Sequence, residues 1–452
     1  MLAARCRRLN VLAKLFLAVA AAFLALLAAY VVWHHAQFLT GVGRAALFFG
    51  APALGCIVCL AALRLPPAAR TMAALLVVSA ACAVYGFEGY LLARAMIARA
   101  PIAATAGADN RTKYEVTRDL RAKGRAAYPA VFPAYLMQTG LDGTLHSPLT
   151  LDGRELLPLG GVARVETVLC NEPGFYVTYM SDRYGFNNPD ATWDAPVGIA
   201  AVGDSFTQGV CVKPGENYAA LLHALNVGSS GAGPLIELAA LREYLPAMKP
   251  RIVLWFFFEG NDLPGDFAIE TKSPLLRGYL DGRTQGLPGR AAGADAALRA
   301  YVDALIAAGP ERIETSAGPI QTAISFIGLA QTRAALALPA ALGPADYLLF
   351  ERVLGEAKKS AAGWGGRLYV VYIPSFCAVV GDKCAPVLGE VRSHVIETSR
   401  TLDLPVIDLL QALQRADDPR GLFTRRDGGH FGPRGNRIVA EAVRARLAQD
   451  GD

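Results

Sequence analysis

Residues 200–209 read Ala-Ala-Val-Gly-Asp-Ser-Phe-Thr-Gln-Gly, and this stretch decides the fold that we expect for the chain. The apolar run 197–202 has the length of a buried strand and ends at a glycine. Ser205 follows two residues later, and a helix-like sequence begins at Tyr218. A strand, a tight turn and a helix would place the Ser205 hydroxyl at the carboxyl end of a sheet, where open α/β proteins bind ligands. A plain turn in which Asp204 or Ser205 caps the next helix accounts for the same residues.

The amino-terminal part of the chain is too apolar for a purely soluble protein. Hydrophobic residues make up 53% of the 452 residues and charged residues only 18%. The excess lies in 11–33, 45–63 and 72–92, and each segment is long enough to cross a hydrocarbon core of about 30 Å. We therefore expect a membrane domain at 1–100 with three transmembrane helices. A cleaved signal peptide is the rival for the first segment, but that segment exceeds an ordinary signal core and two spans follow it.

Basic residues indicate the orientation in the membrane. Four of them precede the first span: Arg5, Arg7, Arg8 and Lys14. Only Arg44 lies in the next loop, so the positive-inside rule puts the amino terminus in the cytoplasm and everything after the third span outside. Arg94 and Arg99 argue mildly the other way, but they lead into a long domain whose charges count for less. We expect a protein of the bacterial inner (plasma) membrane with a periplasmic or otherwise extracytoplasmic domain.

Charge and cysteine usage exclude some classes of ligand. The formal charge is only +5 and no basic block alternates with aromatic residues, so nucleic-acid binding has little support. The outer domain has four cysteines, an even number in a compartment that permits disulfides. Cys377 can pair with Cys384 and Cys170 with Cys211, although four unpaired thiols also fit. No Cys-x-x-Cys pair or His-rich ligand set occurs there, so no metal site is expected.

The rest of the chain divides into a preface and a core. We interpret 101–195 as a linker followed by a β-rich preface, because short runs alternate with Pro and Gly. From 196 to 452, helical stretches alternate with apolar runs, of which 251–258 has the composition of a strand buried on both faces. This alternation predicts a parallel sheet flanked by helices. Further strands are expected at 367–373 and 405–409.

The segment 263–344 departs from this rhythm and is rich in Ala and Gly. We interpret it as an insertion beside the site that could form a lid over it. A structural elaboration and a contact with the membrane surface are equally open.

Serine chemistry needs a base, a group that orients the base, and donors for the oxyanion. Among six histidines, His430 follows a predicted strand, lies in a Gly-rich loop and has Asp427 three residues before it. In a loop or helical turn this spacing can bring the Asp427 carboxylate to Nδ1 of the imidazole and leave Nε2 for Ser205. A surface pair of Asp427 and His430 is the alternative.

Gly231 and Asn261 have positions that suit oxyanion donors. Each follows a predicted core strand or its exit loop, so each would lie at the same sheet edge as Ser205. A glycine lets its backbone N–H approach a ligand closely, and the Asn side chain carries an amide donor. A turn glycine and a helix-capping Asn are the alternatives.

Four motifs occur in a characteristic order: Gly-Asp-Ser, Asn-x-Gly-x-x-Gly, Gly-Asn-Asp and Asp-x-x-His. They resemble the four sequence blocks of the GDSL/SGNH hydrolase superfamily. The resemblance implies an α/β fold with a flavodoxin-like parallel sheet flanked by helices, and no cofactor. It also implies that Ser205 is the nucleophile, that His430 is the base, and that Asp427 orients it. Gly231 and Asn261 would complete the oxyanion hole together with the N–H of Ser205.

The resemblance and the apolar spans together predict a membrane-anchored esterase or O-acyltransferase. Its expected substrates are acyl esters, chiefly acetyl esters, of cell-envelope or secreted polysaccharide, and polysaccharide machinery of the envelope is an expected partner. A lipase or lysophospholipase acting at the membrane is an alternative, because three spans tether the chain to a bilayer. A non-catalytic envelope assembly protein that retains the fold is the alternative from another class.

Overall fold

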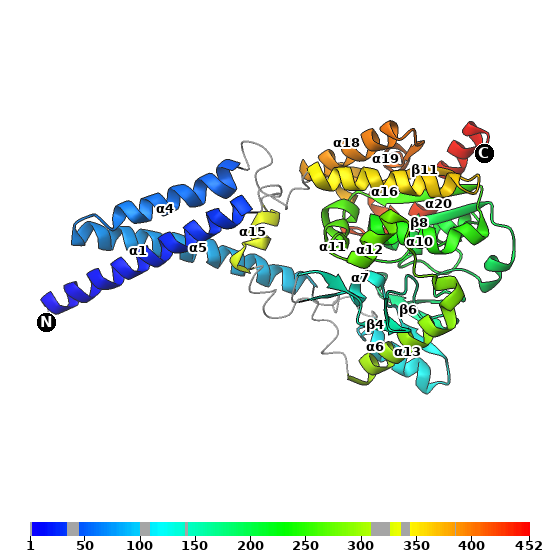
Figure 1. Ribbon diagram of the computed structural model, residues 1–452, viewed down its shortest axis with the longest axis horizontal. Helices are drawn as coiled ribbons and strands as arrows, with labels where there is room; N and C mark the ends of the chain where they lie inside the picture. The colour runs from blue at the N-terminus through cyan, green and yellow to red at the C-terminus, as the bar shows by residue number, and fades with distance from the viewer. Residues whose placement is uncertain are drawn as a thin grey trace. The chain divides into compact units, whose positions relative to one another are not determined.

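The computed structural model describes residues 2–33, 45–99, 109–140, 143–308, 326–335, 344–384 and 386–452 (Figure 1). The chain forms two compact units. The first comprises Met1–Ala100 and Ala317–Tyr347, and the second comprises Pro101–Ser316 and Leu348–Asp452. The preface expected at 101–195 therefore belongs to the same unit as the expected core, and part of the expected insertion belongs to the first unit.

The first unit contains three helices that are long and apolar enough to cross a membrane, over Arg8–Trp33, Ala45–Ala62 and Pro67–Arg94. They belong to the elements α1 (Leu2–Trp33), η1 with α4 (Ala45–Gly50 and Ala51–Ala62) and α5 (Pro67–Arg99). Leucine side chains on these helices are exposed; the exposed fraction is 71% for Leu26 and 65% for Leu76. Such a surface suits lipid rather than water. The prediction of three apolar helices is confirmed, and they indicate a membrane anchor.

A short helix, α15 (Ala330–Ala335), packs against α5 in this unit. Glu88 of α5 is buried, and its carboxylate accepts the backbone N–H groups of Gln331 and Thr332 at 2.9 and 2.7 Å. These are orphan donors of the first helical turn, which need acceptors. This part of the expected insertion is therefore associated with an apolar helix. Residues 309–325 and 336–343 of the insertion lie outside the described residues.

The second unit is built on a five-stranded sheet in which every neighbouring pair of strands is parallel. Its strands in chain order are β8 (Ile199–Gly203), β9 (Leu225–Asn226), β10 (Ile252–Phe258), β11 (Arg367–Ile373) and β12 (Val406–Asp408). Across the sheet they run β12-β11-β10-β8-β9, which read from the other edge is the order 2-1-3-4-5. That is the flavodoxin-like order of doubly wound proteins. The predicted flavodoxin-like α/β fold is confirmed.

Apolar composition explains the central place of β10 in the sheet. Six residues of β10 are buried, from Ile252 to Phe257, because this strand lies at the centre and helices cover both faces. The longer helices around the sheet are drawn in Figure 1: α10 (Pro234–Met248), α16 (Pro344–Ala362), α18 (Pro386–Thr401) and α20 (Pro433–Asp450). In the register, Gly203 pairs with Phe256, and Phe258 pairs with Ile373. The loops after β8, β10 and β11 therefore leave from one edge of the sheet.

The region before the sheet forms a second, smaller sheet of β1 (Ala127–Pro129), β6 (Glu166–Cys170) and β7 (Val177–Met180). Strand β6 pairs with β1 in parallel and with β7 antiparallel. A disulfide between Cys170, the last residue of β6, and Cys211 joins this sheet to the loop after β8, with Cα atoms 5.3 Å apart. The structure also joins Cys377 to Cys384. Both pairings that the sequence allowed are therefore formed.

The remaining elements of this unit, among the described residues, are mostly short. The helical ones are α6 (Lys113–Ala122), α7 (Pro133–Leu136), η2 (Asp190–Asp194), α8 (Ser205–Gln208), α9 (Tyr218–Leu221), η3 (Asp262–Phe267), α11 (Ala268–Glu270), α12 (Pro274–Gly278), η4 (Tyr279–Asp281), η5 (Leu287–Arg290), α13 (Ala291–Ala308), α17 (Phe376–Val380), α19 (Leu410–Gln414) and η7 (Pro419–Leu422). Three antiparallel strand pairs accompany them: β2 (Gln138–Thr139) with β3 (Leu145–His146), β4 (Leu149–Leu151) with β5 (Arg154–Leu156), and β13 (Phe423–Arg425) with β14 (Gly428–Phe431).

Candidate active site

The turn after β8 presents Ser205 at the start of helix α8. Strand β8 ends at Gly203, where an added Cβ would overlap the Thr207 hydroxyl, so only glycine fits. Asp204 is fully buried and caps α8, because its carboxylate accepts the N–H of Phe206 at 2.9 Å. The capping interpretation of Asp204 and the placement of Ser205 after the carboxyl end of a strand are thus both correct.

His430 reaches this serine from the carboxyl-terminal hairpin. It lies on strand β14, which pairs with β13, and its ring packs against the ring of Phe206 with centroids 5.0 Å apart. Its Nε2 is 2.9 Å from the Ser205 Oγ, a hydrogen-bond distance. The structure therefore brings together the nucleophile and base that the sequence predicted.

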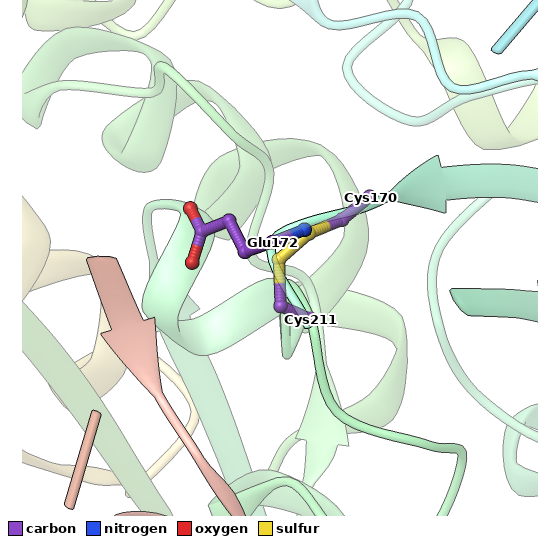
Figure 2. A group of neighbouring side chains, drawn as sticks. All are labelled: Cys170, Glu172 and Cys211. Carbon is purple, nitrogen blue, oxygen red and sulfur yellow. A yellow bond between two sulfur atoms is a disulfide. The ribbon is translucent and has the colours of Figure 1, made fainter. Parts of the chain in front are cut away.

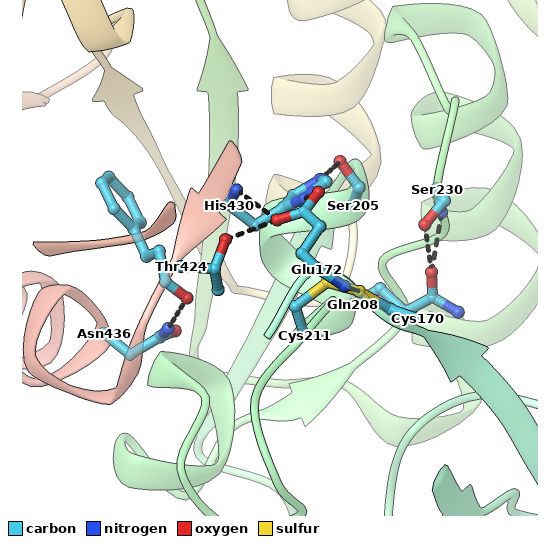
Figure 3. Close-up of a disulfide and its surroundings, with 10 residues drawn as sticks. Cys170, Glu172, Ser205, Gln208, Cys211, Ser230, Thr424, His430 and Asn436 are labelled. Carbon is cyan, nitrogen blue, oxygen red and sulfur yellow. Dashed lines mark hydrogen bonds and ion pairs between the residues drawn. A yellow bond between two sulfur atoms is a disulfide. The ribbon is translucent and has the colours of Figure 1, made fainter. Parts of the chain in front are cut away.

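Glu172 occupies the other side of the imidazole (Figure 3). Its Oε1 is 2.7 Å from Nδ1 of His430, and its Oε2 accepts the backbone N–H of His430 at 3.0 Å. The Thr424 hydroxyl also donates to Oε2. Burial favours a higher pKa for Glu172, but the hydrogen bond and charge of His430 outweigh it and lower the pKa to about 2. Glu172 is therefore a charged acceptor that fixes the orientation of the imidazole.

Gly231 and Asn261 follow the strands on either side of β8. Gly231 has φ +69° in the loop after β9, and the neighbouring Ser230 N–H donates to Gln208 Oε1 of helix α8 at 3.0 Å. Asn261 follows β10 by three residues and donates its Nδ2 to Asp266 Oδ2 at 2.7 Å. Because β8, β9 and β10 are parallel neighbours, both residues lie at the sheet edge that carries Ser205. That is where the sequence predicted them.

Comparison with known proteins adds matches to solved structures only. No protein-family model and no curated protein matches the chain. A lipase/acylhydrolase from Enterococcus faecalis is 13% identical, with a TM-score of 0.31 and coverage of 56% of this chain and 95% of that one. A GDSL-family lipolytic protein from Veillonella parvula is 14% identical, with a TM-score of 0.31 and coverage of 55% of this chain and 97% of that one. The acetyl xylan esterase AlAXEase is 12% identical, with a TM-score of 0.32 and coverage of 55% of this chain and 98% of that one.

The sheet order is flavodoxin-like, and the motifs that follow its strands resemble those of the GDSL/SGNH hydrolase superfamily. The second unit therefore has a flavodoxin-like α/β fold. The chain differs from the pattern of that superfamily in the acid that contacts the histidine.

Asp427 does not contact His430, so the predicted pair is corrected. Its side chain is 78% exposed and forms an ion pair with Arg425 at 3.1 Å. The reason lies in the backbone, because Gly428–Phe431 is a strand rather than a helical turn. Three residues of extended chain span about 10 Å, and residues three apart point to opposite faces. The carboxylate beside Nδ1 of His430 is that of Glu172 instead.

Sequence reasoning missed Glu172 because it lies 258 residues from His430. One signal could have found it. Glu172 is two residues after Cys170, and Cys211 is six residues after Ser205. A disulfide between Cys170 and Cys211 places Glu172 close to the predicted nucleophile, so this pairing in the sequence indicates Glu172 as a candidate.

The side chains of Cys170, Glu172 and Cys211 lie close enough together to suggest a metal site, with ligand atoms within 4.8 Å of one another. Figure 2 shows that the two sulfur atoms are bonded to each other. A metal would need thiolates, which a disulfide does not offer. The carboxylate of Glu172 is already used by His430 and Thr424. The donor set therefore does not fit a metal ion while the disulfide is formed.

Buried carboxyl groups gather beside Ser205 and Asn261. Burial, followed by the charge of Asp204, raises the pKa of Asp266 to about 7. Burial also raises the pKa of Asp204 to about 6 and that of Glu270 to about 8. The pKa values of Glu237 and Asp262 lie well above the ordinary range for the same reason. Desolvation and mutual repulsion hold much of this cluster neutral near pH 7.

Proposed function

We propose that the chain is a membrane-anchored serine esterase in which Ser205 is the nucleophile, His430 the base and Glu172 the acid that orients it. The single observation that carries the proposal is the continuous chain of contacts, 2.9 Å from Ser205 Oγ to His430 Nε2 and 2.7 Å from Nδ1 to Glu172. Nucleophile, base and orienting acid in this order are the arrangement of serine hydrolases on unrelated folds.

The chemistry follows from that geometry. Ser205 Oγ attacks the ester carbonyl while its proton passes to Nε2 of His430, and the Glu172 carboxylate stabilises the imidazolium. The tetrahedral oxyanion takes hydrogen bonds from the Gly231 N–H and the Asn261 amide. His430 then protonates the departing alcohol, which leaves an acyl group on Ser205. Water completes hydrolysis, and a sugar hydroxyl in its place completes acyl transfer.

The proposed substrates are acyl esters of envelope or secreted polysaccharide. The site is open enough for an ester on a large molecule, because the side chains of His430 and Glu172 keep 23% and 25% exposure. The apolar helices support action close to a bilayer, which also keeps a lipid ester as the second candidate. Release of acetate from O-acetylated polysaccharide, compared with fatty-acid release from lysophospholipid vesicles, separates these two. Appearance of the acyl group on an acceptor polysaccharide identifies transfer.

The nucleophile is tested by covalent labelling. Full-length protein in detergent micelles is treated with a fluorophosphonate probe, and the labelled peptide is identified by mass spectrometry. We expect the label on the Ser205 peptide, and we expect Ser205→Ala to lose both label and cleavage of a chromogenic acetate ester. Ser393→Ala is the matched control, since Ser393 is an exposed helical serine whose hydroxyl donates to the Gly389 carbonyl of its own helix.

Full esterase activity in Ser205→Ala protein would sink the assignment. A non-catalytic envelope protein would show no label on Ser205 and no cleavage in the wild type, whereas its cellular phenotype would survive Ser205→Ala.

A further inference from the structure

The side-chain amide of Asn261 is oriented by a single residue. Its Nδ2 donates to Asp266 Oδ2 at 2.7 Å. Its Oδ1 is buried and has no hydrogen-bond partner among the residues that the structure describes. An Asn side chain with one hydrogen bond can rotate away once that bond is lost. The direction in which the second N–H of this amide points therefore depends on Asp266.

A π-helical turn builds this contact. In η3 (Asp262–Phe267), the N–H groups of Gly265 and Asp266 both donate to the Asn261 carbonyl, at 2.9 and 2.8 Å. In an α-helix, residues five apart point about 140° away from each other, so Asp266 would not face Asn261. The wider turn brings the two side chains onto the same side. Such π turns are rare and are frequent at functional sites.

The surroundings of Asp266 make a charge on it unfavourable for catalysis. The titratable groups that interact with it are all acids: Asp204 after β8, Glu237 on α10, Asp262 and Glu270 on its own segment, and Tyr135 on α7. A carboxylate directly behind the Asn261 amide would oppose the negative charge that the amide is to stabilise. A neutral carboxyl keeps the acceptor oxygen without that repulsion.

We propose that Asp266 is a positioning residue that aims the Asn261 amide at the oxyanion and that it performs this role as the neutral acid. The proposal rests on the proposed function, because it assigns to Asn261 the oxyanion that the esterase reaction forms. Burial is consistent with it, since the pKa of Asp266 is raised to about 7 and the group is largely neutral below that pH.

A double-mutant cycle tests the positioning role. Full-length Asp266→Ala, Asn261→Ala and the double variant are compared in kcat and KM on a short-chain chromogenic ester. Loss of one oxyanion donor lowers turnover roughly 10²–10³-fold, so we expect that loss for Asn261→Ala. We expect Asp266→Ala to lower kcat about ten- to hundredfold with KM within about threefold of wild type, and to add nothing in the Asn261→Ala background. Losses that multiply in the double variant would overturn the role through Asn261.

Asp266→Asn tests the neutral-acid part and guards against misfolding. It keeps an acceptor oxygen and removes the charge, so we expect its kcat to match wild type at pH 6. Above about pH 7 the ratio of variant to wild-type kcat should rise, because only the wild type gains a carboxylate. The ratio cancels any pH dependence that the two proteins share. A ratio that stays constant from pH 6 to 9 would contradict the neutral-acid role.

The two proposals fail in different ways. If the wild type neither cleaves the ester nor labels at Ser205, the proposed function fails. If Ser205→Ala is inactive while Asp266→Ala has wild-type kcat, only the inference about Asp266 fails. Circular dichroism of Asp266→Ala and Asp266→Asn separates a lost fold from a lost contact.

Discussion

Glu172 and His430 are 258 residues apart in the sequence, yet Glu172 Oε1 lies 2.7 Å from His430 Nδ1. The acid of the proposed triad thus comes from the small sheet that precedes the nucleophile, on the loop between β6 and β7. The Asp-x-x-His motif that marks the superfamily is present, but its Asp427 points into solvent beside Arg425. The acid of the sequence motif, Asp427, is therefore not the acid that contacts His430 in the structure.

Glu172→Gln should lower kcat by roughly 10²–10⁴-fold, because the neutral amide removes the charge that stabilises the imidazolium and can favour the wrong tautomer. Asp427→Asn is the matched control, and its kcat should stay within about twofold of wild type, since its side chain is 78% exposed. Both variants are assayed on the same chromogenic ester. A large loss in Asp427→Asn with none in Glu172→Gln would restore the superfamily assignment of the acid.

Glu172 should also stabilise the fold in a defined pH window. Its pKa falls from 4.5 to about 2 in the folded protein, so the folded state binds this proton less readily than the unfolded state. The contribution to the free energy of unfolding is fully present above about pH 4.5 and is lost as pH falls towards 2. The gap in thermal midpoint between wild type and Glu172→Gln should therefore narrow steadily from pH 5 to pH 3. A gap that widens on acidification contradicts the sign of this shift.

The strands that the sequence predicted are those with long apolar runs. The run 251–258 became β10 (Ile252–Phe258), and the stretch predicted at 367–373 became β11 with the same bounds. Burial on both faces leaves a continuous apolar signature in such strands. Strand β9 (Leu225–Asn226) has only two residues, which is too short to carry any periodicity. The flavodoxin-like order depends on it and came from the resemblance.

The site was predictable where function depends on residues close in sequence to a strand end, as for Ser205 and Asn261. It was not predictable where distant segments meet, as for Glu172. The Gly-rich loop expected around His430 is a strand, and that backbone change alone removes Asp427 from reach. The π turn that joins Asn261 to Asp266 leaves no recognisable pattern in the sequence either.

The orientation in the membrane remains a prediction from the basic residues and is open to direct measurement. Ser393→Cys places a thiol on an exposed face of α18 in the second unit. A membrane-impermeant maleimide added to spheroplasts should label this variant before lysis if the unit is extracytoplasmic. Wild type provides the background, because its cysteines outside the two disulfides, Cys6, Cys56, Cys59 and Cys82, all lie in the first hundred residues of the chain. Labelling that requires lysis would reverse the orientation.

The Cys170–Cys211 disulfide should support activity as well as stability. It joins the strand that leads into Glu172 to the loop that follows Ser205, and the Glu172 N–H lies 3.4 Å from Cys170 Sγ. Cys170→Ser/Cys211→Ser should lower kcat about tenfold, because the Glu172 loop loses its covalent attachment to the nucleophile loop.

Cys377→Ser/Cys384→Ser is a matched control for that disulfide. The first disulfide spans 41 residues and the second only 7. Loop-closure entropy then gives losses in the free energy of unfolding of about 4 and about 2 kcal/mol. Only the first pair should also lower kcat, since the Glu172–His430 contact depends on it. Equal kcat in the two double variants, measured well below both melting temperatures, would show that the β6–β7 loop holds Glu172 in place without the disulfide.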